Sequence, residues 1–318
     1  MSLEQLLDAG ASFDAEYGDG LANHLPMALV ALHRLGAPDE RLATFAERYA
    51  HRLSPAPSAA TWRAADSWVA QLGNRDAWSS YRTLFDGWLA DEGKDAVLSQ
   101  VLPVLMRGCG AAAFHGLIRT AYAVQAGHTR ELADALAYWA CRYRVLGDAP
   151  NGGEQDPLVL LLAIKEALPD WSSEKKSIIE RMRDVARVPA YATIAARLCV
   201  DEATLPTLAR HAAQLYGCSG NFTALHLVTS AHAMRVLLQF VDEPLYAVEH
   251  YWGAFVAGFI ASGLRPRQAV EAKYWGALVN AAVESDDDHL IKIVDSCREE
   301  ERAYEGDDWR FAASRAVQ

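Results

Sequence analysis

Six of the ten histidines in this chain lie in apolar segments with helical spacing. An imidazole in such a setting needs a partner for each ring nitrogen, because a buried polar group without one costs a few kcal/mol. One histidine of this kind is usually a hydrogen-bonded core residue, whereas several in one helical chain favour a metal site formed between facing helices. The six are His24, His115, His226, His232, His250 and His289.

The pair His289 and Lys292 adds a second indication of metal chemistry. The two residues are three positions apart and therefore share one face of a helix. Lys292 lies within the apolar stretch LIKIV. Either its side chain extends along its own stem to water, or burial lowers the pKa of its amine and leaves it neutral and nucleophilic. A neutral amine can react with carbon dioxide to form a carbamate, which would place an anionic oxygen ligand beside a histidine nitrogen.

The elements that must position these residues are predicted to be helices. Apolar residues recur at intervals of three and four, and alanine is frequent in the same segments. Strand signals are nearly absent, and Asp19-Gly20 and Asp86-Gly87 fall in contexts typical of loops or helices. Gly36 ends the first helix and Pro38 is expected to prevent its restart. The predicted helices span residues 25–35, 59–72, 77–90, 97–107, 111–125, 129–143, 158–168, 173–188, 205–215, 222–239, 244–262, 267–284 and 288–306.

These helices predict an all-α fold, a single large helical domain over residues 1–318 with an interior metal site. The segment 147–157, GDAPNGGEQDP, is polar and rich in glycine and proline. It could separate two lobes, 1–146 and 158–318. Because the apolar stripes are comparable on both sides, one domain and two lobes both stay open.

Composition excludes several classes of protein. Thirty basic and 41 acidic residues give a net charge of −11, which argues against a broad surface for nucleic acid or anionic lipid. The five cysteines form no C-x-x-C pair, so reduced, buried thiols are expected. Residues 1–14 do not resemble a secretory signal, and the longest apolar run, 158–164, is too short to span a bilayer. A cytoplasmic enzyme or binding protein is predicted, of unknown oligomeric state.

Two local motifs have simpler explanations than the function they suggest. Gly108-Cys109-Gly110 is similar to part of a dinucleotide fingerprint, but the third glycine is absent and no βαβ pattern follows, so no motif for NADPH is found. The run Asp286-Asp287-Asp288 could ligate a metal. Acidic residues at the start of a helix are explained equally well by N-capping and by the helix dipole.

Four blocks of the sequence carry a family resemblance that covers nearly the whole chain, from about His24 to Glu301. In chain order they are NHLPMALVALHRLG, FHGLIRTAYAV, LHLVTSAHAMR and DDDHLIKIVDSCREEE. The chain thereby resembles the questin oxidase-like family. Fungal members act in polyketide pathways, in the oxidative cleavage of anthraquinone or xanthone-type rings. The resemblance implies a small aromatic substrate and dioxygen as reactants.

The resemblance also implies a ligand set. The better understood members are non-haem iron oxygenases whose metal is held by four histidines and a carboxylated lysine. The matching positions here are His24, His115, His226 and His289, with Lys292 as the lysine that carries the carbamate. His232 competes with His226 for the third block, but the two face different sides of a helix, so only one should reach the metal. His226 is chosen. Such a set leaves one octahedral position of Fe(II) for dioxygen or substrate.

Supporting groups are assigned with alternatives. Arg119 shares the helical face of His115 and is predicted, with Tyr122, to be catalytic, although a structural salt bridge explains Arg119 equally well. Thr229 could bond a helix carbonyl or support a ligand. Six aromatic residues could wall a flat substrate or belong to the core. They are Tyr251, Trp252, Phe255, Phe259, Tyr274 and Trp275.

The function favoured by these observations is a non-haem Fe(II) dioxygenase or monooxygenase that oxidises or cleaves an aromatic, polyketide-type ring. Insertion of oxygen next to a ring carbonyl, followed by cleavage of a carbon–carbon bond, is the corresponding reaction. The alternative is a helical protein on the same scaffold that binds a ligand, or that uses a different metal for hydrolysis.

Overall fold

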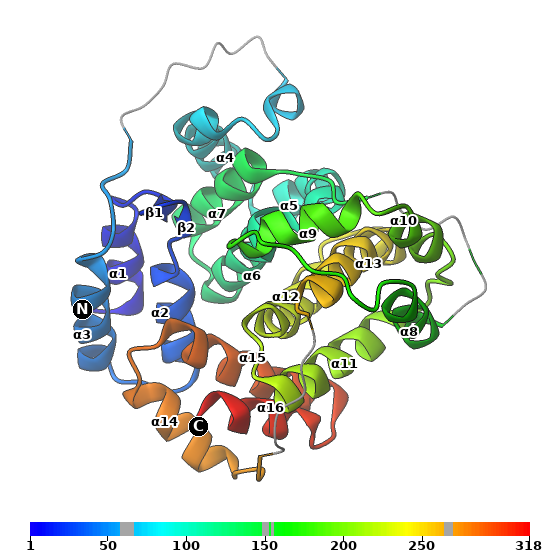
Figure 1. Ribbon diagram of the computed structural model, residues 1–318. Coiled ribbons are helices and arrows are strands. Elements are labelled where there is room, and N and C mark those ends of the chain that lie inside the picture. The colour runs from blue at the N-terminus through cyan, green and yellow to red at the C-terminus, as the bar shows by residue number, and fades with distance from the viewer. Residues whose placement is uncertain (58–66, 148–152, 154–155, 264–269) are drawn as a thin grey trace.

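Helices make up 71% of the computed structural model, which describes residues 1–57, 67–147, 153, 156–263 and 270–318 (Figure 1). The predicted all-α class is confirmed. The helices of the first half are α1 (Leu3–Gly10), α2 (Leu25–Arg34), α3 (Asp39–Ala50), α4 (Trp78–Glu92), α5 (Lys94–Leu105), α6 (His115–Ala126) and α7 (Thr129–Arg142). Those of the second half are α8 (Pro157–Ala167), α9 (Ile178–Ala186), α10 (Pro189–Ala195), α11 (Thr204–Ser219), α12 (Phe222–Leu238), α13 (Pro244–Ala261), α14 (Trp275–Glu284), α15 (Asp288–Tyr304) and α16 (Asp308–Ala316).

Four of these helices form a closed arrangement in the middle of the molecule. Helix α2 packs against α6 and α15, and α12 packs against the same two helices. Figure 1 shows the consequence, since segments from the beginning, middle and end of the chain lie side by side. Long-range packing of this kind brings residues together that are far apart in the sequence.

Local sequence fixes where three of the four helices begin. Asn221 caps α12, because its side-chain oxygen accepts from the backbone N–H groups of Thr223 and Ala224. Asp287 caps α15 in the same way. Helix α2 has a proline at its start, where the fixed φ angle of Pro26 suits the first turn.

Helix α6 begins after an unusual turn. Ala112, Ala113 and Phe114 have φ angles of 49°, 55° and 69°, in the left-handed region that side chains other than glycine rarely adopt. The chain therefore enters α6 through a strained turn that ends directly before His115. One glycine then matters for packing, because a Cβ at Gly116 would meet Trp139 of α7 at 2.7 Å. Gly116 lets α6 approach α7 closely.

Buried apolar residues from α1 through α16 form one hydrophobic core cluster, including residues on both sides of the segment 147–157. Most of that segment lies outside the described residues, so the division into one domain or two lobes stays a prediction. Among the described helices, none is both long and apolar enough to cross a membrane.

Several sequence-based boundaries were wrong. The predicted helix 59–72 falls partly outside the described residues, and its described end forms only a 3-10 turn at Trp68–Gln71. Helix α3 begins directly after Pro38, because proline is well tolerated where a helix starts. Helices α1, α3, α10 and α16 were not predicted. The predicted helix 267–284 starts only at Trp275 in the described residues.

A short hairpin was also missed. Strands β1 (Glu16–Tyr17) and β2 (Leu21–Ala22) pair antiparallel, and Asp19-Gly20 lies in their turn. Two-residue strands are too short to show the alternation by which a strand is recognised in a sequence.

Candidate metal centre

Four histidine rings meet where α2, α6, α12 and α15 begin. The ring centroids of His24 and His115 are 4.7 Å apart, and those of His24 and His289 are also 4.7 Å apart. His226 closes the arrangement, 5.0 Å from His115 and 5.7 Å from His289. The structure thus brings together the four histidines that the family resemblance implied as ligands.

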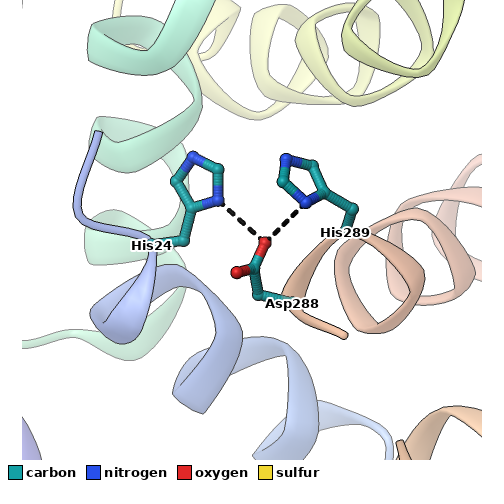
Figure 2. Close-up of side chains that lie close together, drawn as sticks. All are labelled: His24, Asp288 and His289. Atoms are coloured by element: carbon teal, nitrogen blue, oxygen red, sulfur yellow. Dashed lines mark hydrogen bonds and ion pairs between the residues drawn. The ribbon is translucent and has the colours of Figure 1, made fainter. Parts of the chain in front are cut away.

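Asp288 holds two of these rings. Its Oδ1 lies 2.8 Å from Nδ1 of His24 and 2.8 Å from Nδ1 of His289, as Figure 2 shows. A carboxylate oxygen accepts, so each ring donates through Nδ1–H, and Nε2 keeps its lone pair. Both Nε2 atoms are buried and have no hydrogen-bond partner among the described residues. In Figure 2 they point away from the carboxylate.

Backbone carbonyls orient the other two rings. Nδ1 of His115 donates to the carbonyl oxygen of Ala112 at 2.5 Å, and Nδ1 of His226 donates to that of Phe222 at 2.8 Å. Because a carbonyl oxygen only accepts, both rings are Nδ1–H tautomers with a free lone pair on Nε2. Nε2 of His115 is buried and also lacks a partner in the described part of the chain. Ligating histidines are typically oriented in this way, by a hydrogen bond from the nitrogen that does not bind the metal.

Burial keeps the imidazoles of His24, His115 and His226 neutral in the absence of a metal. It lowers the pKa of His24 to about 3, helped by the charge of Lys292 and opposed by Asp288. Burial and neighbouring histidines hold the pKa values of His115 and His226 well below the usual range. Neutral imidazole is the form that binds metals.

Lys292 lies on the buried side of this cluster. Its side chain is 4% exposed, so the alternative that it extends to water is wrong. Burial lowers its pKa to about 8, against the opposing effect of Asp288, whose Oδ1 lies 3.7 Å from Nζ. Lys292 also contributes to the lowered pKa values of His24, His115 and His226. Lysine and histidines therefore belong to one electrostatic cluster.

A cavity of about 690 Å³ opens onto the histidines, a volume typical of small-molecule sites. All four histidines line it, and so does the strained turn at Ala112 and Ala113. The ring of Phe222 lies 4.9 Å from that of His226 and 4.7 Å from that of His289, and 52% of this residue is exposed. Three tyrosines contribute further aromatic surface, namely Tyr17, Tyr138 and Tyr143.

The two residues predicted to be catalytic do not line this cavity. Arg119 forms a buried pair with Glu131, with Nε 2.7 Å from Oε1 and the second nitrogen 2.9 Å from Oε2. This is the structural salt bridge that was the alternative. Tyr122 donates from its hydroxyl to the backbone carbonyl of Lys292 at 3.3 Å. That contact fixes the helix turn that carries the lysine.

His232 is separated from the cluster, and both of its nitrogens have partners. Nδ1 lies 2.7 Å from Glu300 Oε1, and Nε2 lies 3.1 Å from the side-chain nitrogen of Gln125. The geometry therefore favours His226 over His232. His250 is stacked edge-on against Tyr246 and does not line the cavity.

The remaining supporting residues also have structural roles. Thr229 donates to the carbonyl of Leu225, one turn earlier in its own helix. None of the six aromatic residues named from the sequence lines the cavity. Tyr251, Trp252, Phe255 and Phe259 are buried in the core, whereas Tyr274 is mostly exposed and Trp275 bonds Glu301.

Sequence analysis missed two residues of the site. Asp288 was explained as a helix-start residue, yet Asp287 is the cap and Asp288 orients two histidines. A buried acidic residue next to a histidine in the sequence was the available signal. Phe222 lies four positions before His226, which is one helical turn, and this spacing could have placed it beside the ring.

Helix N-termini make the site favourable for negative charge. His24 is the N-cap of α2, His115 and Asp288 are the first residues of α6 and α15, and His226 lies in the second turn of α12. Each helix start carries partial positive charge. A metal dication here therefore needs nearby anions, and among the described residues Asp288 is the carboxylate grouped with His24 and His289. The donor set fits a metal that accepts imidazole nitrogen.

The sequence was also compared with known proteins. The model of a protein family described as questin oxidase-like matches residues 21–297 of the 318. The match covers all four histidines, Asp288 and Lys292. No protein with a curated description matches the chain.

Proposed function

Because the chain belongs to the questin oxidase-like family, whose name implies an oxidase, we propose that it is an Fe(II)-dependent oxygenase. Its substrate is an aromatic, polyketide-type small molecule, which it oxidises or cleaves with dioxygen. The observation that carries the proposal is the set of four histidines whose Nδ1 atoms are all engaged as donors. Their Nε2 lone pairs are left for a metal.

In this proposal, His24, His115, His226 and His289 hold the iron through Nε2. Asp288 fixes the first and last of these rings, and the carbonyls of the turn before α6 and of Phe222 fix the other two. Unsatisfied buried nitrogens are costly, so three of them in one cluster support a bound ion. Bound Fe(II) would supply the activation of dioxygen.

Lys292 is proposed to be carboxylated on Nζ. A pKa of about 8 leaves a fraction of the amine neutral near neutral pH, which is the form that reacts with carbon dioxide. The carbamate would add a second anion to a site that holds four imidazoles and lies at the starts of four helices. The unmodified ammonium would instead oppose a dication, because among the described residues Asp288 is its one ion-pair partner.

The cavity sets the kind of substrate. Its volume suits a fused-ring aromatic molecule, and Phe222 and three tyrosines offer apolar faces for such rings. Phe222 contacts two of the metal-binding rings directly, so an aromatic substrate packed on it lies beside the histidines. Because the rings carry their proton on Nδ1, their Nε2 atoms have no proton to donate to a substrate.

Metal analysis of protein purified without oxygen tests the proposal. We expect stoichiometric iron, consumption of dioxygen with an anthraquinone-type substrate, and incorporation of labelled oxygen into the product. Absence of iron, together with metal binding that survives substitution of His24, His115 or His226, would remove the oxygenase and leave the ligand-binding or hydrolytic alternative. Oxygen consumption without incorporation of label would contradict ring oxygenation.

A further inference from the structure

The cavity that opens onto the histidines has a charge opposite to that of the protein. The chain carries a net charge of −11, yet five cationic side chains and a single carboxylate line this cavity. The carboxylate, Glu16, is already paired with Arg142 and Arg75. The cations are Arg142, Arg144, Lys176, Arg181 and Arg183.

Among the described residues, only one of these five cations, Arg142, forms an ion pair with a carboxylate. In the part of the chain that the structure describes, no ion pair joins Arg144 or Arg183 to a carboxylate. They come from different elements, Arg144 from the segment after α7 and Arg183 from α9. Both residues line the same cavity, and the pKa of Arg144 is lowered by partial burial and then by the charge of Arg183.

A third arginine of the cavity wall, Arg181, has a side-chain nitrogen without a hydrogen-bond partner among the described residues. Arg181 donates to Thr223 Oγ1 at 3.0 Å and to the carbonyl of Lys176 at 3.3 Å. Its Nε is buried and has no partner among the described residues. An anion at the wall of the cavity offsets the repulsion between unpaired guanidinium groups, and a carboxylate matches the geometry of their planar donors.

We propose that this wall is an anion subsite, and that the substrate is an aromatic carboxylate whose acid group is held by Arg144 and Arg183, with Arg181 beside them. The inference rests on the proposed function, because it assumes that the aromatic part of the molecule lies in the same cavity, against Phe222 and the histidines. It deepens that function by naming the substrate class. These arginines determine specificity and are not metal ligands.

Binding of two matched probes tests the subsite. Anthraquinone-2-carboxylate and anthraquinone-2-carboxamide have nearly the same shape but differ in charge. Their dissociation constants are measured by calorimetry on the protein as purified, kept without oxygen so that no turnover occurs. We expect the carboxylate to bind at least about tenfold more tightly, the factor that one charge-assisted hydrogen bond provides. Raising the salt concentration should reduce the preference.

Variants assign the preference to the named residues. The double variant Arg144→Gln/Arg183→Gln should bind both probes with similar affinity and keep its iron content. Arg187→Gln is the control, because it removes a cation that directly follows α9, pairs with Asp184 and lies outside the cavity lining, and it should keep the preference. Equal binding of the two probes by the unaltered protein, a preference that survives the double variant, or no binding of the carboxylate would each overturn the inference.

The experiments distinguish failure of the anion subsite from failure of the proposed oxygenase function. A protein that contains iron but shows no preference for the carboxylate retains the proposed function and loses the anion subsite. A protein without iron that still binds the carboxylate through Arg144 and Arg183 retains the subsite and loses the oxygenase.

Discussion

Nδ1 of His24 lies 2.8 Å from Oδ1 of Asp288, although 264 positions separate the two residues in the chain. The same oxygen accepts from Nδ1 of His289. One carboxylate thus fixes two rings from opposite ends of the sequence and leaves both Nε2 atoms facing away from it (Figure 2). This contact makes the metal centre depend on a residue that is not itself a proposed ligand.

Replacing Asp288 should therefore weaken metal binding. In Asp288→Asn the side chain keeps its shape but loses its charge, so its amide oxygen accepts more weakly from the two rings that the single oxygen Oδ1 now holds. We expect iron affinity to fall by about 10- to 100-fold, the usual effect of losing a group that orients a ligand. Chelator competition measures this. Asp286→Asn is the control, because that exposed residue pairs with Arg41 and Arg48, and it should bind iron normally.

His226 and His232 should respond differently to substitution. His226→Ala is expected to lose iron, because this residue would supply one of the four nitrogens. His232→Ala removes one of the two partners of buried Glu300, leaving Arg235, and should lower the free energy of unfolding by about 1–3 kcal/mol. Folded His232→Ala should still bind iron. Metal content and urea unfolding of both variants separate the two roles, and loss of iron only in His232→Ala would show that the assignment is reversed.

Iron binding should require Lys292, and it should also require carbon dioxide to form the carbamate on that lysine. Lys292→Ala and Lys292→Met are expected to lose iron, because neither can form a carbamate. Bicarbonate should stimulate iron loading of the unaltered protein and leave the variants unchanged. A crystal structure provides the direct measurement, since electron density should extend beyond Nζ. An unmodified Nζ beside a fully loaded metal would contradict the carbamate.

Acid should destabilise the metal-free protein. The pKa of His24 is lowered to about 3 in the folded state, against 6.5 when unfolded. Between these values only the unfolded chain binds the proton, so this contribution to stability is complete above pH 6.5 and is lost as the pH falls toward 3. Each pH unit between these two pKa values corresponds to about 1.4 kcal/mol in the free energy of unfolding. Urea unfolding between pH 7 and 5 should show a steeper loss for the unaltered chain than for His24→Gln.

Arg119 should contribute to stability and not to metal binding. Arg119→Met leaves Glu131 buried without its partner, which should cost about 3–5 kcal/mol in the free energy of unfolding. The double variant Arg119→Met/Glu131→Leu should regain most of this loss, because the unpaired charge is then removed. Iron content per folded molecule should stay unchanged in both. A large loss of iron in the double variant would show that Arg119 contributes to metal binding.

Much of the fold could be predicted because its signals are local. The periodicity of α12 and α15 follows from residues within a few positions of one another, and their start points follow from the capping residues Asn221 and Asp287. The turn before α6 carried no such signal, because Ala112 and Ala113 adopt left-handed backbone angles that alanine rarely adopts. Tertiary packing imposes that conformation.

The helical class and the residue types of the site could be predicted from the sequence alone. Without cysteine pairs, a metal site had to use histidine and oxygen donors, and four matching blocks identified His24, His115, His226 and His289. Three features required the packed helices: the rings of these histidines lie together, His232 lies apart from them with Glu300, and Arg119 pairs with Glu131. The reason is physical. Periodicity depends on neighbours in the chain, whereas hydrogen-bond partners and burial depend on which helices pack together.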